Sequence, residues 1–193
     1  MNNLPELKTN YENTKVLNEG MVFWFTGLSG SGKTTLANLI NKELLKLNYR
    51  SFILDGDVIR KGLNSDLAFS DNDRLENNRR IAEVAKLLIN AGFIVFVSCI
   101  SPFEKDRQLT RKICGDNNYT EVYFDCPIDI CEERDVKGLY RKARLGLIPN
   151  FTGIGSPYEP PTAPDIIIKT NNCDINQSLQ VLQTYVLQII EHS

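Results

Sequence analysis

The chain has 193 residues, of which 42% are hydrophobic and 24% carry a charge. This length and composition suit one globular domain with a hydrophobic core of its own. The formal net charge of −2 gives no overall positive field to hold a nucleic acid backbone, so we expect no nucleic acid partner.

The cysteines and the first residues indicate where the protein works. The five cysteines are odd in number and contain no C-x-x-C pair, so we expect neither a disulfide framework nor a zinc site. Free thiols are typical of the reducing cytoplasm. The chain does not begin with a basic segment followed by an apolar one, and no apolar run approaches the roughly 18 residues of a membrane span. We therefore expect a cytoplasmic protein with no membrane partner.

Residues 1–20 are polar and predict a loosely attached N-terminal arm, followed by one domain over residues 21–193. The domain opens with an apolar run over residues 21–26, which predicts a buried strand. The segment after it matches G-x-x-x-x-G-K-[ST], a loop that binds the phosphates of a nucleoside triphosphate. Its residues are Gly27, Leu28, Ser29, Gly30, Ser31, Gly32, Lys33 and Thr34, and Thr35 opens a predicted helix over residues 35–47.

The chemistry of phosphate binding explains this spacing. The glycines let consecutive backbone N–H groups converge on phosphate oxygens, and the following helix adds the positive end of its dipole. Lys33 can reach the β- and γ-phosphates, while the Thr34 hydroxyl is placed to bind a bridging Mg²⁺. The loop therefore predicts a nucleoside triphosphate as co-substrate, Mg²⁺ as cofactor and Lys33 as a catalytic residue; the family resemblance given below implies that the triphosphate is ATP.

Two carboxylates follow the next predicted strand, over residues 51–54. Asp55 and Asp57 come directly after its carboxyl end, where parallel strands meet the ligand crevice. We expect Asp55 to support the metal and Asp57 to accept the proton of an attacking hydroxyl. The alternative for Asp55 is a cap on the next helix.

A helical pattern over residues 72–91 follows, with its apolar stripe toward the core. Arg74 and Asn77 share the buried side of this helix near its start, where an arginine would meet an anion. A solvated surface cluster is the alternative. Beyond it the pattern predicts a strand over residues 93–100, a helix over 104–114, a strand over 120–124 and a helix over 129–134.

The stretch from residue 137 to 164 is first basic and then rich in glycine and proline, which is typical of an active-site lid. A strand over residues 165–169 and a C-terminal amphipathic helix complete the pattern. Apolar strands alternating with helices predict an α/β fold of three layers, with a mostly parallel sheet, helices on both faces and a lid: the phosphate-loop kinase architecture.

Five further blocks resemble one family, adenylylsulfate kinase. They are Asp55-Gly-Asp57-x-x-Arg60; Phe69-Ser70-x-x-Asp73-Arg74-x-Glu76-Asn77; Ile100-Ser101-Pro102-Phe103; Cys131-Glu-x-Arg134-Asp135-x-Lys137-Gly138-Leu139-Tyr140; and Asn150-Phe151-Thr152-Gly153-Ile154 with Pro157-Tyr158-Glu159. The resemblance covers about residues 20–190. It implies transfer of the ATP γ-phosphoryl group to the 3′-hydroxyl of adenosine 5′-phosphosulfate, which gives 3′-phosphoadenosine 5′-phosphosulfate and ADP in sulfate assimilation.

The resemblance also implies residue roles. Asp57 matches the acidic residue at the 3′-hydroxyl, and the other matched substrate positions are Arg60, Phe69, Arg74, Asn77, Ile100 and Ser101. Arg134 matches a position over the ATP adenine, and Cys173 lies where the chain passes that base. Lys137, Lys142, Gly153 and Ile154 fall in the lid over both nucleotides. A homodimer and a functional link to an ATP sulfurylase are further implications.

One segment of the lid departs from the family pattern. Leu145-Gly-Leu-Ile-Pro149 stands where Ala-Gly-Glu-Ile-Lys is usual, so two charged residues of the lid are missing.

Ser101 raises a question of mechanism. Some members of the family are described with a phosphoserine intermediate at the matching serine, which would make the reaction two displacements. The lone histidine, His192, is two places from the end of the chain, so no histidine is expected to activate Ser101. We therefore favour direct transfer, with Ser101 hydrogen-bonded to the sulfonucleotide.

Two other functions stay open. A kinase for another small nucleotide would share the phosphate loop and an aspartate base, but it has no reason to carry the Phe69–Asn77 block. A GTP-dependent switch could use Asp135-x-x-Gly138, although no Asn-Lys-x-Asp for guanine is present.

Overall fold

The computed structural model describes residues 14–17, 19–171 and 173–192. Its five strands are β1 (Met21–Thr26), β2 (Ser51–Asp55), β3 (Ile94–Ser98), β4 (Tyr119–Asp125) and β5 (Ile166–Lys169). The α-helices are α1 (Lys33–Lys46), α2 (Gly56–Ile59), α3 (Asp71–Asn90), α4 (Glu104–Cys114), α5 (Ile128–Arg134), α6 (Leu139–Arg144) and α7 (Ile175–Glu191), and a 3₁₀ turn covers Asp116–Asn118.

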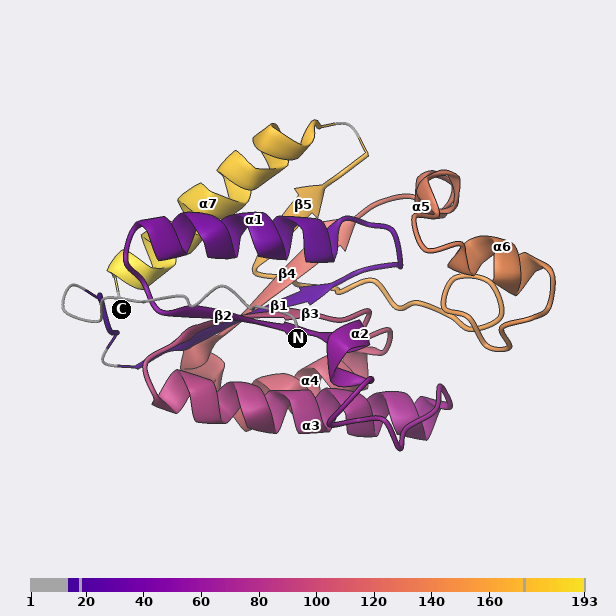
Figure 1. Cartoon of the computed structure of the whole chain (residues 1–193), viewed down its shortest axis with the longest axis horizontal. Coiled ribbons are helices and arrows are strands. Elements are labelled where there is room, and N and C mark those ends of the chain that lie inside the picture. The colour runs from indigo at the N-terminus through magenta and orange to yellow at the C-terminus, as the bar shows by residue number, and fades with distance from the viewer. Residues whose placement is uncertain (1–13, 18, 172, 193) are drawn as a thin grey trace, which may run out of the picture.

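All five strands run parallel in one sheet, in the order β2-β3-β1-β4-β5. Helices α1 and α7 cover one face of the sheet, and α3 and α4 cover the other (Figure 1). The three-layer α/β fold with a parallel sheet, predicted from the alternation of apolar strands and helices, is confirmed.

The central strand β1 explains why the sheet is covered on both faces. All six of its residues are buried. Phe23 and Phe25 pack into the core beneath α1 and α7, while Val22 and Trp24 pack into the core above α3 and α4. Since successive side chains of a strand point to opposite faces, an uninterrupted apolar strand requires a helical layer on each side.

The two longest helices begin at side-chain caps. Ser70 and Asp73 form a capping box at the start of α3, and Asp174 and Gln177 form one at the start of α7. Each box satisfies backbone N–H groups that the first turn leaves without partners. The cap at Ser70 fixes where α3 starts, and thereby where Arg74 and Asn77 lie.

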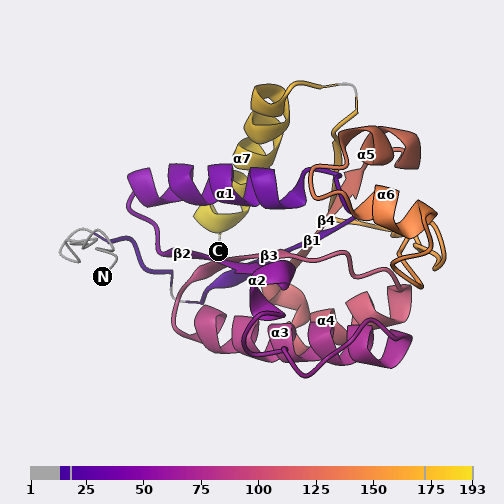
Figure 2. The ribbon, with the colours of Figure 1, turned by 45° about the vertical axis from the view of Figure 1, so that its right-hand side comes forward.

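Two short helices were not anticipated from the sequence. Helix α2 follows β2 directly, and α6 lies inside the segment 137–164. Helices α5 and α6 and the chain after them project beyond the ends of the sheet strands, as Figures 1 and 2 show. The segment predicted to be a lid therefore contains a helix of its own.

The end of the predicted N-terminal arm lies against the domain. The backbone N–H of Lys15 donates to Asn48 O at 2.7 Å, and Leu17 packs against the core beneath α1. Residues 1–13 and 18 lie outside the described residues, so the rest of the predicted arm stays a prediction.

Candidate active site

The phosphate loop connects β1 to α1 and holds its own lysine. Lys33 Nζ donates to Gly27 O at 2.8 Å, Leu28 O at 2.7 Å and Ser31 Oγ at 3.3 Å. The side chain is buried, and burial lowers the pKa of Lys33 to about 8. The ammonium is thus held among carbonyl and hydroxyl oxygens of the loop, and phosphate oxygens entering the loop would take their place.

Gly30 shows how closely the rest of the protein packs on this loop. Its φ is +79°, and a Cβ there would lie 2.9 Å from the backbone oxygen of Cys131 in α5. Ser29 O accepts a hydrogen bond from Tyr140 OH at 2.9 Å, and Ser31 O accepts one from Thr170 Oγ1 at 2.9 Å. The loop is therefore shaped from outside by α5, α6 and the turn after β5.

Oxygen ligands for a metal lie beside the loop. Thr34 Oγ1 donates to Asp55 Oδ2 at 2.8 Å and lies 3.1 Å from Ser98 Oγ. Asp55 Oδ1 meanwhile accepts from the backbone N–H groups of Asp57 and Val58, so Asp55 also caps α2. The structure thus shows Asp55 as a helix cap, and its support of a metal stays a prediction. Thr35, the third residue of α1, is exposed.

This donor set fits Mg²⁺. Mg²⁺ prefers hard oxygen ligands and usually takes only one or two from the protein, with waters and substrate phosphates completing the octahedron. Within residues 14–17, 19–171 and 173–192 no group of three or more His, Cys, Asp or Glu side chains could hold a metal by itself. Thr34 and Asp55 match the smaller contribution that Mg²⁺ needs.

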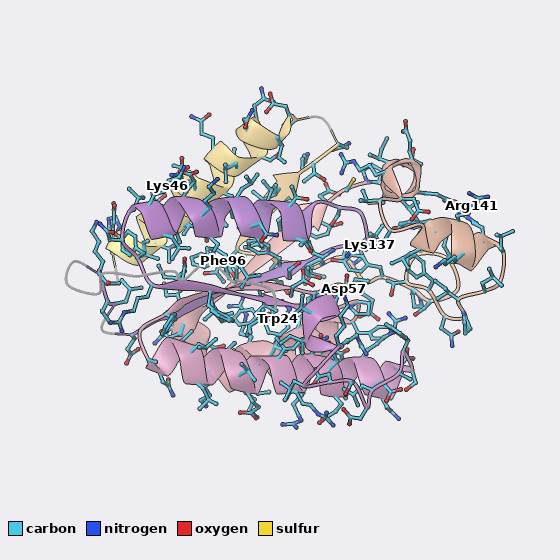
Figure 3. The ribbon with its side chains drawn as sticks, viewed as in Figure 1. Trp24, Lys46, Asp57, Phe96, Lys137 and Arg141 are labelled. Atoms are coloured by element: carbon cyan, nitrogen blue, oxygen red, sulfur yellow. The ribbon has the colours of Figure 1, made fainter. Side chains whose placement is uncertain are left out.

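Asp57 and Lys137 meet across the site. Lys137 Nζ donates to Asp57 Oδ2, and the two side chains are 52% and 61% exposed, respectively. Asp57 comes from the start of α2 and Lys137 from the turn before α6, and Figure 3 shows them facing each other between these elements. The ion pair joins the β2 side of the site to the lid segment.

Two arginines and an aromatic ring lie around the turn from α2 to α3. The Arg60 guanidinium lies 4.6 Å from the Phe69 ring centroid, and Arg60 Nη1 donates to Ala68 O at 2.8 Å. Phe69 is 58% exposed, so much of its ring is free. Arg74 is buried and donates from Nε to Phe69 O at 3.0 Å, from Nη1 to Thr152 Oγ1, and from Nη2 to Asn150 O at 2.5 Å. The structure gives Arg74 neutral acceptors, two of them in the lid segment.

Asn77 lies one turn further along α3 and is also buried. Its Oδ1 accepts from Asn64 Nδ2 at 3.0 Å, so the side chain is held from the turn after α2. Ile100 lies in the turn after β3. Its carbonyl oxygen accepts hydrogen bonds from Thr26 Oγ1 at 2.7 Å and from the backbone N–H of Gly27 at 3.4 Å. These bonds fix the phosphate loop relative to the turn after β3.

Ser101 is placed differently from the sequence expectation. Its hydroxyl accepts from Trp24 Nε1 at 2.9 Å and lies 3.4 Å from Asn78 Oδ1, to which it donates. The residue is 2% exposed and its φ is +45°, a conformation that only a few per cent of non-glycine residues adopt. In this conformation the Ser101 hydroxyl is turned into the core and is not presented to a ligand.

The far end of the phosphate loop meets Arg134. Arg134 Nη1 donates to Gly30 O at 3.3 Å, and Nη2 donates to Thr170 O at 2.5 Å. The guanidinium therefore bridges the loop and the turn after β5. Cys173 lies in that turn and is exposed, and no contact in the described part of the chain joins it to Arg134.

The lid segment shares a small core with α5. Tyr140 and Phe151 of the lid and Cys131 of α5 are buried in it, and Ile154 and Leu28 pack against them. Lys142 lies on α6 and is exposed. Asp135 accepts from the backbone N–H groups of Tyr140 and Arg141, which lowers the pKa of Asp135 and caps α6. The Asp135–Gly138 match to a GTP-switch motif is thus a helix cap.

A groove of about 670 Å³ runs along the lid on the β4 side, and Gly153 and Ile154 line it together with Leu28, Asp125 and Tyr158. Its lining includes neither Thr34 nor Asp57.

Sequence reasoning missed several residues that hold the site together: Asn64, Thr152, Tyr158 and Thr170. Thr152 and Tyr158 lie inside the blocks that resemble the family, but an uncharged hydroxyl side chain does not by itself indicate a role in the site. Thr170 had a signal, because it follows the carboxyl end of β5, where ligand-facing residues gather.

Comparisons with known proteins agree on one family. The model of the family described as adenylylsulphate kinase matches residues 19–169. An adenylyl-sulfate kinase of Acaryochloris marina is 52% identical over 170 residues, which are 88% of this chain and 81% of the relative. One of Clostridium acetobutylicum is 50% identical over 179 residues, covering 88% and 89% of the two chains.

A solved structure shows the same similarity in three dimensions. The Mycobacterium tuberculosis APS kinase CysC, solved in complex with AMPPNP and APS, superimposes with a TM-score of 0.84 at 45% identity. The match covers 90% of this chain and 98% of that one. Because the family model matches most of its length and its relatives are about 50% identical to it, this chain belongs to the adenylylsulfate kinase family.

Proposed function

We propose that this chain transfers the γ-phosphoryl group of ATP to the 3′-hydroxyl of adenosine 5′-phosphosulfate, giving 3′-phosphoadenosine 5′-phosphosulfate and ADP. Membership of the family supports this reaction. The main structural support for this reaction is the set of side chains on the acceptor side of the site. There a buried guanidinium, Arg74, lies near a second one, Arg60, and an exposed ring, Phe69, is available to stack on a base.

The donor side binds ATP. The phosphate loop, with Lys33 and Thr34, takes the triphosphate, and Arg134 covers the adenine from its place between Gly30 and Thr170. Mg²⁺ held by Thr34 and Asp55 would neutralise the developing charge on the phosphates. Cys173, which the resemblance placed near the base, stays a prediction.

The acceptor side binds the sulfonucleotide and supplies the base. Asp57 takes the proton of the 3′-hydroxyl, and Lys137 holds that carboxylate in place across the site until the hydroxyl arrives. Arg60 and Arg74 pair with the phosphosulfate oxygens, Phe69 stacks on the adenine, and Asn77 supplies a directional amide. Transfer is direct. Ser101 contributes by shaping the turn after β3, since its hydroxyl is engaged by Trp24.

Residues 137–164 act as the lid, with Lys142, Gly153 and Ile154 among the parts that approach the nucleotides. The remaining expectations are a cytoplasmic homodimer and a functional link to an ATP sulfurylase. These expectations rest on the family resemblance and on the five free cysteines. Among the described residues no helix is long and apolar enough to cross a membrane.

A coupled ADP-release assay tests the reaction. With ATP and Mg²⁺, turnover with adenosine 5′-phosphosulfate should far exceed turnover with AMP, because the two arginines accommodate a larger anionic group than a lone phosphate. Asp57→Asn should lower kcat by roughly 100-fold or more while ATP binding is largely kept. Comparable turnover with AMP would contradict the assignment.

A further inference from the structure

We propose that Thr152 is a positioning residue for the acceptor: its hydroxyl orients the Arg74 guanidinium, so that the lid and the sulfonucleotide site are set by one side chain. The inference rests on the proposed function. Nothing in the sequence motif gives Thr152 this role. It follows from where the structure places the hydroxyl.

The geometry begins with the donors of Arg74. A guanidinium has five N–H groups in a fixed planar fork. Three are used by Phe69 O, Thr152 Oγ1 and Asn150 O, one from each nitrogen. The other two N–H groups, one on Nη1 and one on Nη2, have no hydrogen-bond partner among the residues that the structure describes. An anion that binds Arg74 through these groups must approach the edge that Thr152 and Asn150 orient.

Arg74 and Thr152 are both buried, so the hydrogen bond between them strongly affects how the guanidinium is oriented. Arg74 is 7% exposed and Thr152 is 1% exposed. A buried charge is costly unless hydrogen bonds satisfy it, so the guanidinium turns toward whatever acceptors are present. Burial lowers the pKa of Arg74, and the nearby Arg60 acts in the same direction, which favours an incoming anion as a partner. Without the Thr152 hydroxyl, the planar group would lose one of the three contacts that fix its orientation.

The same contacts connect two elements that meet the acceptor. Arg74 reaches back to Phe69 and forward to residues 150 and 152 of the lid segment. The Thr152 backbone is in turn paired with Ser156, so its position is coupled to the rest of that segment. A change at Thr152 should therefore affect the acceptor nucleotide and leave ATP, which the phosphate loop and Arg134 hold, largely unaffected.

The test compares Thr152→Val, which keeps the shape and removes the hydroxyl, with Thr152→Ser, which keeps the hydroxyl. Thr110→Val is a matched control, because Thr110 is also a fully buried threonine, hydrogen-bonded to Tyr119 OH and Arg107 O. The dissociation constant of adenosine 5′-phosphosulfate is measured by calorimetry without ATP, and KM for both substrates and kcat are measured in turnover. Thermal denaturation monitors folding of each variant.

We expect Thr152→Val to weaken binding of the sulfonucleotide about tenfold, the scale of one hydrogen bond to a charged group. KM for ATP should change less than twofold, and kcat should change little. This pattern is expected when the lost interaction stabilises the bound sulfonucleotide equally in the ground state and in the transition state. Thr152→Ser should restore the affinity, and Thr110→Val should leave it unchanged.

Four results would overturn the inference: an unchanged affinity in Thr152→Val, an equal loss for ATP, a Thr152→Ser variant as poor as Thr152→Val, or a Thr152→Val variant that does not fold while Thr110→Val does. If the wild-type protein binds no adenosine 5′-phosphosulfate, it is the proposed function that fails, so the two failures are distinguishable.

Discussion

At the scale of single residues, the site depends on side chains whose partners decide their role. Ser101 is an example. Its residue type and its position after β3 fit a nucleophile or a ligand contact, but Trp24 and Asn78 engage its hydroxyl inside the core. Arg107, which is buried, also donates to the Ser101 carbonyl at 2.9 Å. These bonds hold the turn after β3 in its unusual backbone conformation.

Ser101→Ala should therefore act on stability more than on chemistry. The substitution leaves the buried Trp24 Nε1–H without its acceptor, which costs about 1–3 kcal/mol of unfolding free energy. We expect kcat within about tenfold of wild type if transfer is direct, as proposed above. Urea denaturation and steady-state kinetics measure the two effects. A loss of kcat by several orders of magnitude, together with a phosphorylated Ser101 trapped by ATP alone, would establish the covalent route.

Asp106 gives a pH-dependent prediction. It is fully buried in α4, and neither carboxylate oxygen has a hydrogen-bond partner among the residues that the structure describes. Burial raises the pKa of Asp106 to about 6, and Asp71 and Glu159 act in the same direction while Lys105 and Arg107 oppose them. Because the folded pKa lies above the unfolded one, stability from this group is present below about pH 4 and is lost as the pH rises through 6.

Asp106→Asn removes that titration. At pH 8 the variant should be more stable than the wild type by about 1–3 kcal/mol, and the difference should shrink as the pH falls from 6 to 4. Urea denaturation at pH 4.5 and pH 8 measures it. A difference that is the same at both pH values would contradict the assignment of Asp106 as a buried carboxyl that resists ionisation.

At the scale of elements, α5 packs on the phosphate loop at Gly30, a position that the loop motif leaves open. Gly30→Ala would place a Cβ 2.9 Å from the Cys131 backbone oxygen, whereas Gly115, with a similar positive φ, has open space around it. We expect Gly30→Ala to raise the dissociation constant of ATP about tenfold or more, because α5 and Arg134 must move off the loop.

Gly115→Ala is the control for that variant, since it carries the strain of an unfavourable positive-φ conformation alone, about 1–3 kcal/mol. Its affinity for ATP should equal that of the wild type, and calorimetry with ATP compares the two. Equal affinities in Gly30→Ala and Gly115→Ala would show that the packing of α5 does not shape the nucleotide site.

The helices and strands also show which parts of the fold could be predicted from the sequence. Apolar runs such as residues 21–26 made all five strands predictable, and an amphipathic pattern did the same for α3. Helix α6 was not predicted because it has only six residues and lies at the start of a segment that soon becomes rich in glycine and proline, which suggests irregular chain. Contacts between segments far apart, such as Arg74 with Thr152 and Lys137 with Asp57, depend on the folded lid, and no local pattern encodes them.

At the scale of the whole molecule, one parallel sheet places donor and acceptor chemistry at the same edge. The phosphate loop follows β1, Asp55 ends β2 and Asp57 lies just after it, and the Ile100–Ser101 turn follows β3. Three neighbouring strands therefore end in the site. The lid segment comes from beyond β4 and meets the site where Lys137 pairs with Asp57 (Figure 3). It also accepts a hydrogen bond from Arg74 of α3 at Thr152. This arrangement suits the direct transfer proposed above, in which ATP and the acceptor hydroxyl meet at one edge of the sheet.

The destination of the phosphoryl group tests this account most directly. The protein is incubated with ATP labelled in the γ-phosphoryl group, Mg²⁺ and adenosine 5′-phosphosulfate, and the product is treated with a nucleotidase specific for 3′-phosphates. We predict a labelled nucleotide whose label the nucleotidase releases as phosphate, and no labelled nucleotide from an acceptor that lacks the 3′-hydroxyl. A labelled product that resists the nucleotidase, or labelling of the 3′-deoxy acceptor, would contradict transfer to the 3′-hydroxyl.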